Sequence, residues 1–167
     1  DNDEYNVDEF VDVLNKEKDK GRIKVFGGSN WTLDRFKKAN EWAKKNNKYE
    51  MSILNNNLAL AKMIKPLWSG CLSSNDHDIL RYLEKTKKSH MSWSSQARGF
   101  FLDDEITKKI EEKITKDETW RAPGEHSSGP LSCYESEDNR ERKKRARDLA
   151  EKKGCSAHNI AASWTIN

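Results

Sequence analysis

The chain has 167 residues, of which 34% are hydrophobic and 35% are charged. Its 31 basic and 28 acidic side chains leave a formal net charge of only +3, so no strong overall field attracts nucleic acid or a membrane surface. No apolar run is long enough to span a bilayer, and the acidic N-terminal segment DNDEYNVDEF is unlike a signal peptide. We therefore expect a cytoplasmic protein that makes no membrane contact.

Helices and short apolar runs alternate along the first part of the chain. Apolar residues recur at helical spacing after Val7, and Gly21 ends that pattern. Thr32 is a candidate N-cap for a second helix, which would end at the Asn46–Asn47 turn. The expected order is helix, strand, helix, strand, over residues 7–20, 23–26, 33–45 and 49–54.

The second part of the chain repeats this alternation and then becomes helical. A long irregular stretch follows the second strand, and Asp76 can cap the next helix. The run from Met91 to Trp93 predicts a third strand. Three further helices are expected, around Ile106–Ile114, over residues 139–153, and after Ser156. Residues 116–135 contain a Gly/Pro/Ser-rich stretch without periodicity, which predicts a mobile loop.

Short strands that alternate with helices predict an α/β fold with a parallel sheet built from right-handed βαβ units. In such folds, ligands bind at the carboxyl ends of the strands. The polar residues that directly follow each expected strand are therefore the candidate site residues. Ser29 and Asn30 follow the first strand in GRIKVFGGSNW, and the segment from Ser94 to Arg98 follows the third in SHMSWSSQARG.

These strand-end residues have the chemistry that a nicotinamide nucleotide requires. Ser29 and Asn30 can each donate and accept hydrogen bonds, as a primary carboxamide requires of its partners. Trp93 offers a flat face for stacking, and Arg98 can pair with phosphate. The alternative is that Trp93 belongs to the core and that Ser29 and Asn30 cap the helix beginning near Thr32. No glycine-rich phosphate loop and no pair of histidines at metal-ligand spacing is present in the sequence.

The run RERKKRARDLAEKK at residues 140–153 is dense enough in basic residues to suggest a nucleic-acid patch. Its charges, however, alternate at i,i+4 spacing, with Glu141 before Arg145 and Arg147 before Glu151. A solvated helix face explains this pattern more simply than nucleic-acid binding does.

The order of the motifs resembles the second half of an aldo-keto reductase. GRIKVFGGSNW, the tract before LALA, MSWSSQARGFF and RARDLAEKKGCSAHNIAASW follow one another as the corresponding segments do in that family. WSSQARGFF is similar to one branch of the family, in which tryptophan replaces the commoner tyrosine. The resemblance covers most of residues 7–166.

The resemblance implies an NADP(H)-dependent carbonyl reductase on a (β/α)8 TIM barrel, of which this chain would form a partial domain over residues 1–167. Ser29 and Asn30 would hold the nicotinamide carboxamide, and Asn55 would stand near the family's glutamine for that group. Trp93 would stack on the nicotinamide ring. Further residues would lie along the pyrophosphate, namely Ser94, Gln96, Ala97 and Arg98.

The same resemblance implies that this chain lacks the catalytic half of the barrel. The family's catalytic tyrosine, its aspartate and lysine partners and its substrate-orienting histidine lie on the first four strands, and no such set is matched here. A complete barrel takes about 250 residues. We therefore expect about three parallel strands with flanking helices, whose open edge needs a partner. That partner would be the protein's own N-terminal half or a second copy. The alternative function is a non-catalytic regulatory or interaction module that uses the open half-barrel.

Overall fold

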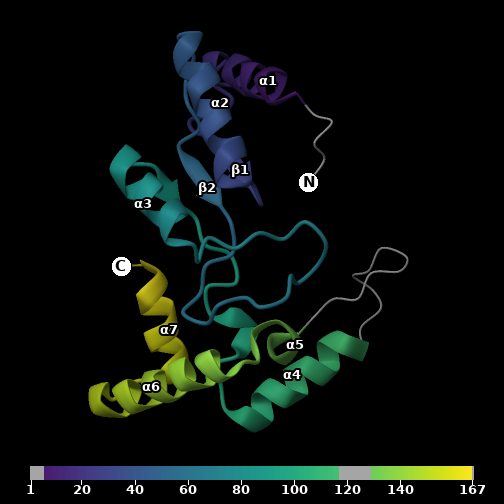
Figure 1. Cartoon of the computed structure of the whole chain (residues 1–167), viewed down its shortest axis with the longest axis vertical. Helices are drawn as coiled ribbons and strands as arrows, with labels where there is room; N and C mark the ends of the chain where they lie inside the picture. The colour runs from purple at the N-terminus through teal and green to yellow at the C-terminus, as the bar shows by residue number, and fades with distance from the viewer. Residues whose placement is uncertain (1–5, 117–128, 167) are drawn as a thin grey trace. The chain divides into compact units, whose positions relative to one another are not determined.

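The computed structural model describes residues 6–116 and 129–166 (Figure 1). Its contacts divide the chain into two compact units. Unit 1 comprises Asp1–Asn56 and Asp76–Met91, and unit 2 comprises Asn57–Asn75 and Ser92–Asn167. Each unit is described by itself below, and the expectation of a single partial domain stays a prediction.

Unit 1 contains a parallel sheet of three strands in the order β1-β2-β3, with helices between them. Its elements are α1 (Val7–Asp19), β1 (Gly27–Ser29), α2 (Leu33–Lys45), β2 (Ile53–Asn55), α3 (His77–Thr86) and β3 (Ser89–His90). The expected alternation of helix and strand is confirmed. Thr32 accepts a hydrogen bond from the amide of Arg35, and Asp76 accepts one from the amide of Asp78, so both predicted N-caps are also confirmed.

The positions of the strands differ from the prediction. The apolar run at residues 23–26 precedes β1 instead of forming it, and Val25 is exposed. β1 instead begins at Gly27, where a Cβ atom would stand 1.9 Å from the carbonyl oxygen of Ile53. A glycine there allows β1 to approach β2 closely. The third strand ends one residue before Met91, whose amide still donates to the Leu54 carbonyl at 2.9 Å.

The core of unit 1 lies where α1 and α2 pack on each other and against the sheet residues. α2 contributes Phe36, Ala39 and Ala43 at spacings of three and four, and all three are fully buried. Leu54 in β2 and Met51, two residues before the strand, are also fully buried. These contacts fix the strands whose carboxyl ends carry the candidate site.

Unit 2 consists of helices and of irregular segments that cross them. Its elements are η1 (Ala97–Gly99), α4 (Asp104–Lys116), α5 (Pro130–Tyr134), α6 (Glu137–Lys153) and α7 (Ala157–Ile166). α5 packs against α4 and η1, and α7 packs against α6 (Figure 1). The helices predicted around Ile106–Ile114, over residues 139–153 and after Ser156 are confirmed. Of the segment 116–135, α5 is described as a short helix, whereas residues 117–128 lie outside the described residues.

A small apolar core holds unit 2 together. Phe100, Phe101 and Tyr134 are at most 2% exposed, and Phe100 makes ring contacts with each of the other two. Alanines of α6 and α7 complete this core, among them Ala146 and Ala161. Small residues at the α6–α7 contact allow the two helices to approach closely.

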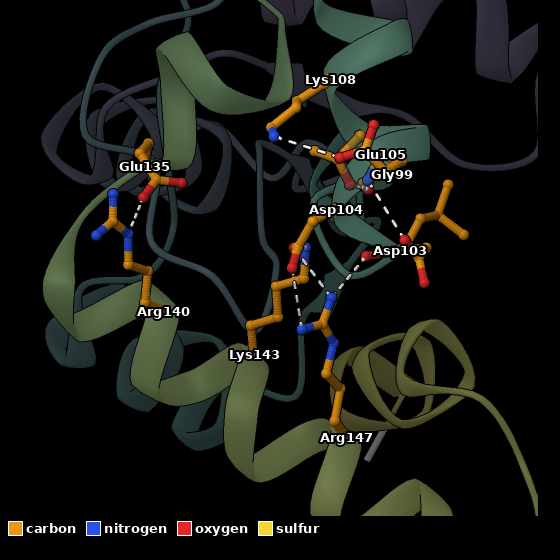
Figure 2. A network of polar contacts seen from close by, with 11 residues as sticks. Gly99, Asp103, Asp104, Glu105, Lys108, Glu135, Arg140, Lys143 and Arg147 are labelled. Carbon is orange, nitrogen blue, oxygen red and sulfur yellow. Dashed lines mark hydrogen bonds and ion pairs between the residues drawn. The ribbon is translucent and has the colours of Figure 1, made fainter.

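A carboxylate at the start of α4 ties this helix to α6 (Figure 2). Asp104 accepts hydrogen bonds from Lys143 at 2.8 Å and from Arg147 at 3.0 Å, which lie four residues apart on one face of α6. The prediction that Arg147 pairs with Glu151 is therefore wrong, because Arg147 contacts Asp104 instead. The predicted Glu141–Arg145 pair is present at 3.6 Å. The basic run is a helix face with ion pairs, as expected.

Two further observations concern membrane-spanning helices and the cysteines. Within residues 6–116 and 129–166, no helix has both the length and the apolar character needed to cross a bilayer. In the part of the chain that the structure describes, none of the three cysteines forms a disulfide, and Cys71 and Cys133 are buried whereas Cys155 is exposed.

The Asp104 ion pairs predict a pH-dependent stability. The ammonium of Lys143 and then the guanidinium of Arg147 lower the pKa of Asp104 to about 2, below its ordinary value of 3.8. The carboxylate therefore stabilises the fold above about pH 4, and this contribution is lost as the pH falls towards 2. Because 64% of the Asp104 side chain is exposed, water screens the pairs, and we expect Asp104→Asn to lower the free energy of unfolding at pH 7 by about 1 kcal/mol.

Urea unfolding at pH 7 and at pH 3 checks this prediction. Asp148→Asn is the matched control, because its only ion pair in the described structure, with Lys144, joins two exposed side chains of α6. The difference between wild type and Asp104→Asn should shrink at pH 3. An equal loss at both pH values, or an equal effect of the control, would contradict the role given to Asp104.

Candidate functional site

The first group of predicted site residues lies at the carboxyl ends of the strands in unit 1. The parallel register places Ser29 beside Asn55, and the Ser29 hydroxyl donates to Asn55 Oδ1 at 2.9 Å. The amide of Asn30 donates to the Asn55 carbonyl at 3.0 Å, and Asn55 Nδ2 donates to the Met91 carbonyl at 2.6 Å. The structure thus brings Ser29, Asn30 and Asn55 together, and Asn55 links the ends of all three strands.

These bonds leave capacity for a ligand that carries a primary amide. A carboxamide side chain has two N–H groups and two acceptor lone pairs, so the bonds named above use about half of what Asn55 offers. The Ser29 hydroxyl donates its only proton to Asn55, which leaves its oxygen able to accept. Ser29 is exposed at the end of its strand. The group fits a carboxamide, with Ser29 as an acceptor and Asn55 as a donor.

A neighbouring asparagine fixes the turn that follows β1. Asn56 is fully buried, and its side chain accepts from the amide of Trp31 at 3.2 Å and donates to the Trp31 carbonyl at 2.9 Å. This pair of bonds holds the turn in which Asn30 adopts a φ of +54°. Sequence reasoning missed the role of Asn56. The alternative that Ser29 and Asn30 cap the following helix is wrong, because Thr32 is its N-cap.

The second group of predicted site residues lies in unit 2, in the segment after β3. Trp93 begins this segment, and the chain then passes through a tight turn in which the amide of Ala97 donates to the Ser94 carbonyl at 2.8 Å. Ser94, Ala97, Arg98 and Gly99 all have positive φ values, of 51°, 49°, 55° and 97°. Such a concentration of left-handed residues is costly for non-glycine residues and is typical of functional loops.

Two buried polar atoms of this segment have no hydrogen-bond partner among the described residues. They are Nε1 of Trp93 and Nε of Arg98, and both are donors. Buried donors are normally paired, so their presence beside a strained turn favours an anionic or polar ligand there. Gln96 is exposed, whereas Ala97 is fully buried and its amide already donates to the Ser94 carbonyl within the turn.

Trp93 packs against the core of unit 2 and also contacts a second aromatic side chain. Its ring stacks on that of Trp68, with centroids 5.2 Å apart and planes inclined by 25°. Trp68 comes from the irregular stretch after β2 and is 43% exposed. Sequence reasoning gave Trp68 no role, because nothing in the local pattern connects it with Trp93.

A third asparagine, Asn57, holds the segment that carries Trp93. Its Nδ2 donates to the Trp93 carbonyl at 3.3 Å and to the Tyr134 hydroxyl at 3.0 Å. Its backbone accepts from the amide of Ser74 at 2.7 Å and donates to the Leu72 carbonyl at 2.9 Å. Asn57 is fully buried and so connects three chain segments of unit 2.

Neither group of predicted site residues contains a carboxyl, imidazole or phenol group that could act as a general acid. Burial raises the pKa of the Tyr134 hydroxyl to about 12, away from neutrality, so this tyrosine is a poor proton donor at pH 7. Among residues 6–116 and 129–166, no group of three or more potential metal ligands is present.

Comparison with known proteins identifies the family. The family model described as the aldo/keto reductase family matches residues 1–167. The chain belongs to the aldo/keto reductase family. No curated protein sequence matches the chain. The family membership expected from the ordered motifs is confirmed, whereas its assignment to the C-terminal half and to the WSSQARGFF branch stays a prediction.

A solved structure supports the fold. The glycerol dehydrogenase of Gluconobacter oxydans is similar to this aldo/keto reductase chain with a TM-score of 0.61 and 21% sequence identity. The similarity covers 99% of this chain and 43% of the dehydrogenase, so the chain spans less than half of that protein. The expected α/β fragment of a (β/α)8 barrel, with three parallel strands and flanking helices, is confirmed.

The predicted cofactor residues thus fall into two groups. Ser29, Asn30 and Asn55 belong to unit 1, whereas Trp93, Ser94, Gln96, Ala97 and Arg98 belong to unit 2. Each group is internally consistent with its expected ligand, the carboxamide for the first and the ring and pyrophosphate for the second. Their roles stay predictions.

The Asn57 contacts predict an energetic coupling that can be measured. Asn57→Ala removes a buried amide and leaves the Tyr134 hydroxyl and the Trp93 carbonyl without this partner, so we expect a loss of about 1–3 kcal/mol in the free energy of unfolding. Tyr134→Phe should cost about 1 kcal/mol. In the double variant the second change should cost less than it does alone, because the bond is already lost.

Urea unfolding of the two single variants and the double variant measures this coupling. Gln96→Ala is the control, because it removes an exposed amide from the same unit and should change the stability by less than about 0.5 kcal/mol. Strictly additive effects of Asn57→Ala and Tyr134→Phe would show that the bond contributes nothing.

Proposed function

We propose that this chain binds NADP(H) and supplies part of the cofactor site of an aldo/keto reductase that acts on a carbonyl substrate. The observation that carries the proposal is the strained segment after β3, in which Trp93 and Arg98 keep buried donors without a partner among the described residues. Family membership supports the same cofactor class. When bound, the reduced cofactor supplies a hydride to a carbonyl carbon.

Each group of residues has a separate task in this proposal. Ser29 accepts a hydrogen bond from the nicotinamide amide, and Asn30 and Asn55 hold the carboxamide in one orientation. Trp93 stacks on the ring. In the turn that follows, the guanidinium of Arg98 pairs with the pyrophosphate, and Ser94, Gln96 and Ala97 lie along it.

The proton of the reaction has to come from another part of the enzyme. Reduction of a carbonyl group places negative charge on its oxygen, which a general acid must protonate. Tyr134 is buried and has a pKa of about 12, so it does not serve this purpose. We propose that the catalytic tyrosine, aspartate, lysine and histidine of the family lie outside this chain, in the part of the barrel that it does not span.

The pyrophosphate contact gives the first test. Arg98→Gln removes the charge but keeps a polar side chain of similar length, and we expect it to weaken NADPH binding at least tenfold, because hydrogen bonds to charged groups are the stronger ones. Isothermal titration calorimetry on the purified chain measures the affinity without relying on tryptophan fluorescence.

Arg145→Gln is the matched control for this experiment. Arg145 is an exposed arginine of the same unit, ion-paired to Glu141 on α6, and its loss should leave the affinity unchanged. Absence of NADPH binding by the wild-type chain up to millimolar cofactor would overturn the proposed function. Equal effects of the two substitutions would remove Arg98 from the site.

The second candidate function is an interaction module, and the edges of the sheet favour it. Within the described residues, β1 and β3 each pair with β2 alone, so both outer edges are without a strand partner. Open parallel edges pair readily with other strands. Val25 and Met91, which flank these edges in the chain, are exposed by 58% and 56%. The partner would be the N-terminal half of the barrel or a second copy of the chain.

Light scattering tests this second candidate. We expect the mean mass of the chain to rise as its concentration is raised to tens of micromolar, because pairing buries the edges and the apolar side chains beside them. Val25→Lys and Met91→Lys should reduce the rise, and Ile166→Lys, which changes an apolar residue of unit 2 that is 84% exposed, is the control. A constant monomer mass would count against an assembly role.

A further inference from the structure

The aromatic stack in unit 2 extends the proposed cofactor site by one residue. We infer that Trp68 is a positioning residue for nicotinamide binding: its ring covers one face of Trp93, holds the indole plane in place, and leaves the opposite face for the nicotinamide. This inference rests on the proposed function, because it concerns the ring whose partner would be the cofactor.

The first step of the argument is that the plane of Trp93 needs an external support. The backbone of Trp93 is fixed, since its carbonyl accepts from Asn57. Its indole Nε1, by contrast, has no hydrogen-bond partner among the described residues. No hydrogen bond therefore sets the rotation of the ring, which is held by packing against the core of unit 2 and by the stacked contact with Trp68 at 5.2 Å, the more directional of the two.

The second step is that Trp68 itself is held firmly. Its neighbours Leu67 and Cys71 are 1% and 7% exposed, so the short turn that carries Trp68 is anchored in the core on both sides. The amide of Cys71 donates to the Trp68 carbonyl at 3.3 Å, and Gly70 has a φ of +80°, which lets the turn close. Trp68 itself is 43% exposed.

The third step concerns the cost of binding. When a ligand ring stacks on a freely rotating side chain, binding costs the conformational entropy of that side chain. A side chain that is already held in place binds the ligand without this cost. A tryptophan that is 43% exposed over a second tryptophan leaves much of its surface in water, which stability alone does not require. Its value is greater where the ring beneath it has a ligand to receive.

Replacement of Trp68 tests the inference on the full chain. Trp68→Met keeps the bulk of the side chain without its ring, and we expect it to weaken NADPH binding about three- to tenfold, the range that one aromatic contact provides. Trp68→Phe keeps a ring and should stay within about threefold of wild type. Trp164→Met is the matched control, since Trp164 lies in the same unit and is 42% exposed, and it should leave the affinity unchanged.

A second ligand separates positioning from a merely structural role. ADP-ribose carries the pyrophosphate but no nicotinamide, so its affinity should be the same in wild type and in Trp68→Met. An equal loss for both ligands would show that Trp68 only supports the fold, and tighter NADPH binding by Trp68→Met would show that Trp68 blocks the nicotinamide face. Either result overturns the inference. A wild-type chain that binds neither ligand would overturn the proposed function as well, whereas binding of ADP-ribose but not NADPH would overturn the ring site alone.

Discussion

Three consecutive asparagines, of which the first ends the second strand, hold the candidate site in place. Asn55 links the ends of the three strands, Asn56 fixes the turn at Trp31, and Asn57 supports the segment at Trp93. The side-chain amides of Asn55 and Asn56 donate and accept at once, which a hydrocarbon or a carboxylate side chain could not do, and that of Asn57 donates twice. Asn56 and Asn57 are fully buried, so any loss of these bonds would leave polar groups unsatisfied where water cannot replace them.

This arrangement explains why a chain with so few hydrophobic residues forms defined loops. The strands are only two or three residues long and contribute few ladder bonds of their own. Side-chain amides extend the pairing beyond the strands, as in the contact of Asn55 with the Met91 carbonyl. Hydrogen bonds of side-chain amides are directional, so they fix the positions of loops more precisely than apolar contacts do.

The sequence predicted the helices better than the strands, for a physical reason. Helix limits depend on local signals, and Thr32 and Asp76 act as the N-caps that their positions indicated. Strands depend on partners that are distant in the chain. Gly27 has low intrinsic strand propensity, yet it forms β1 because its missing side chain admits the Ile53 carbonyl. No local pattern near residue 27 shows that contact, so the sequence predicts the strand on the apolar run before it.

The same division applies to the site. Polar residues at strand ends could be predicted because a parallel sheet directs all its carboxyl ends to one edge. The stack of Trp68 on Trp93 could not be predicted, because the two residues are 25 positions apart and Trp68 lies in an irregular stretch without periodicity. The candidate binding residues can thus be predicted from their positions after the strands. The residues that support their side chains have no such signal in the sequence. The supporting residues of a binding site are for this reason the part that a structure adds to a family resemblance.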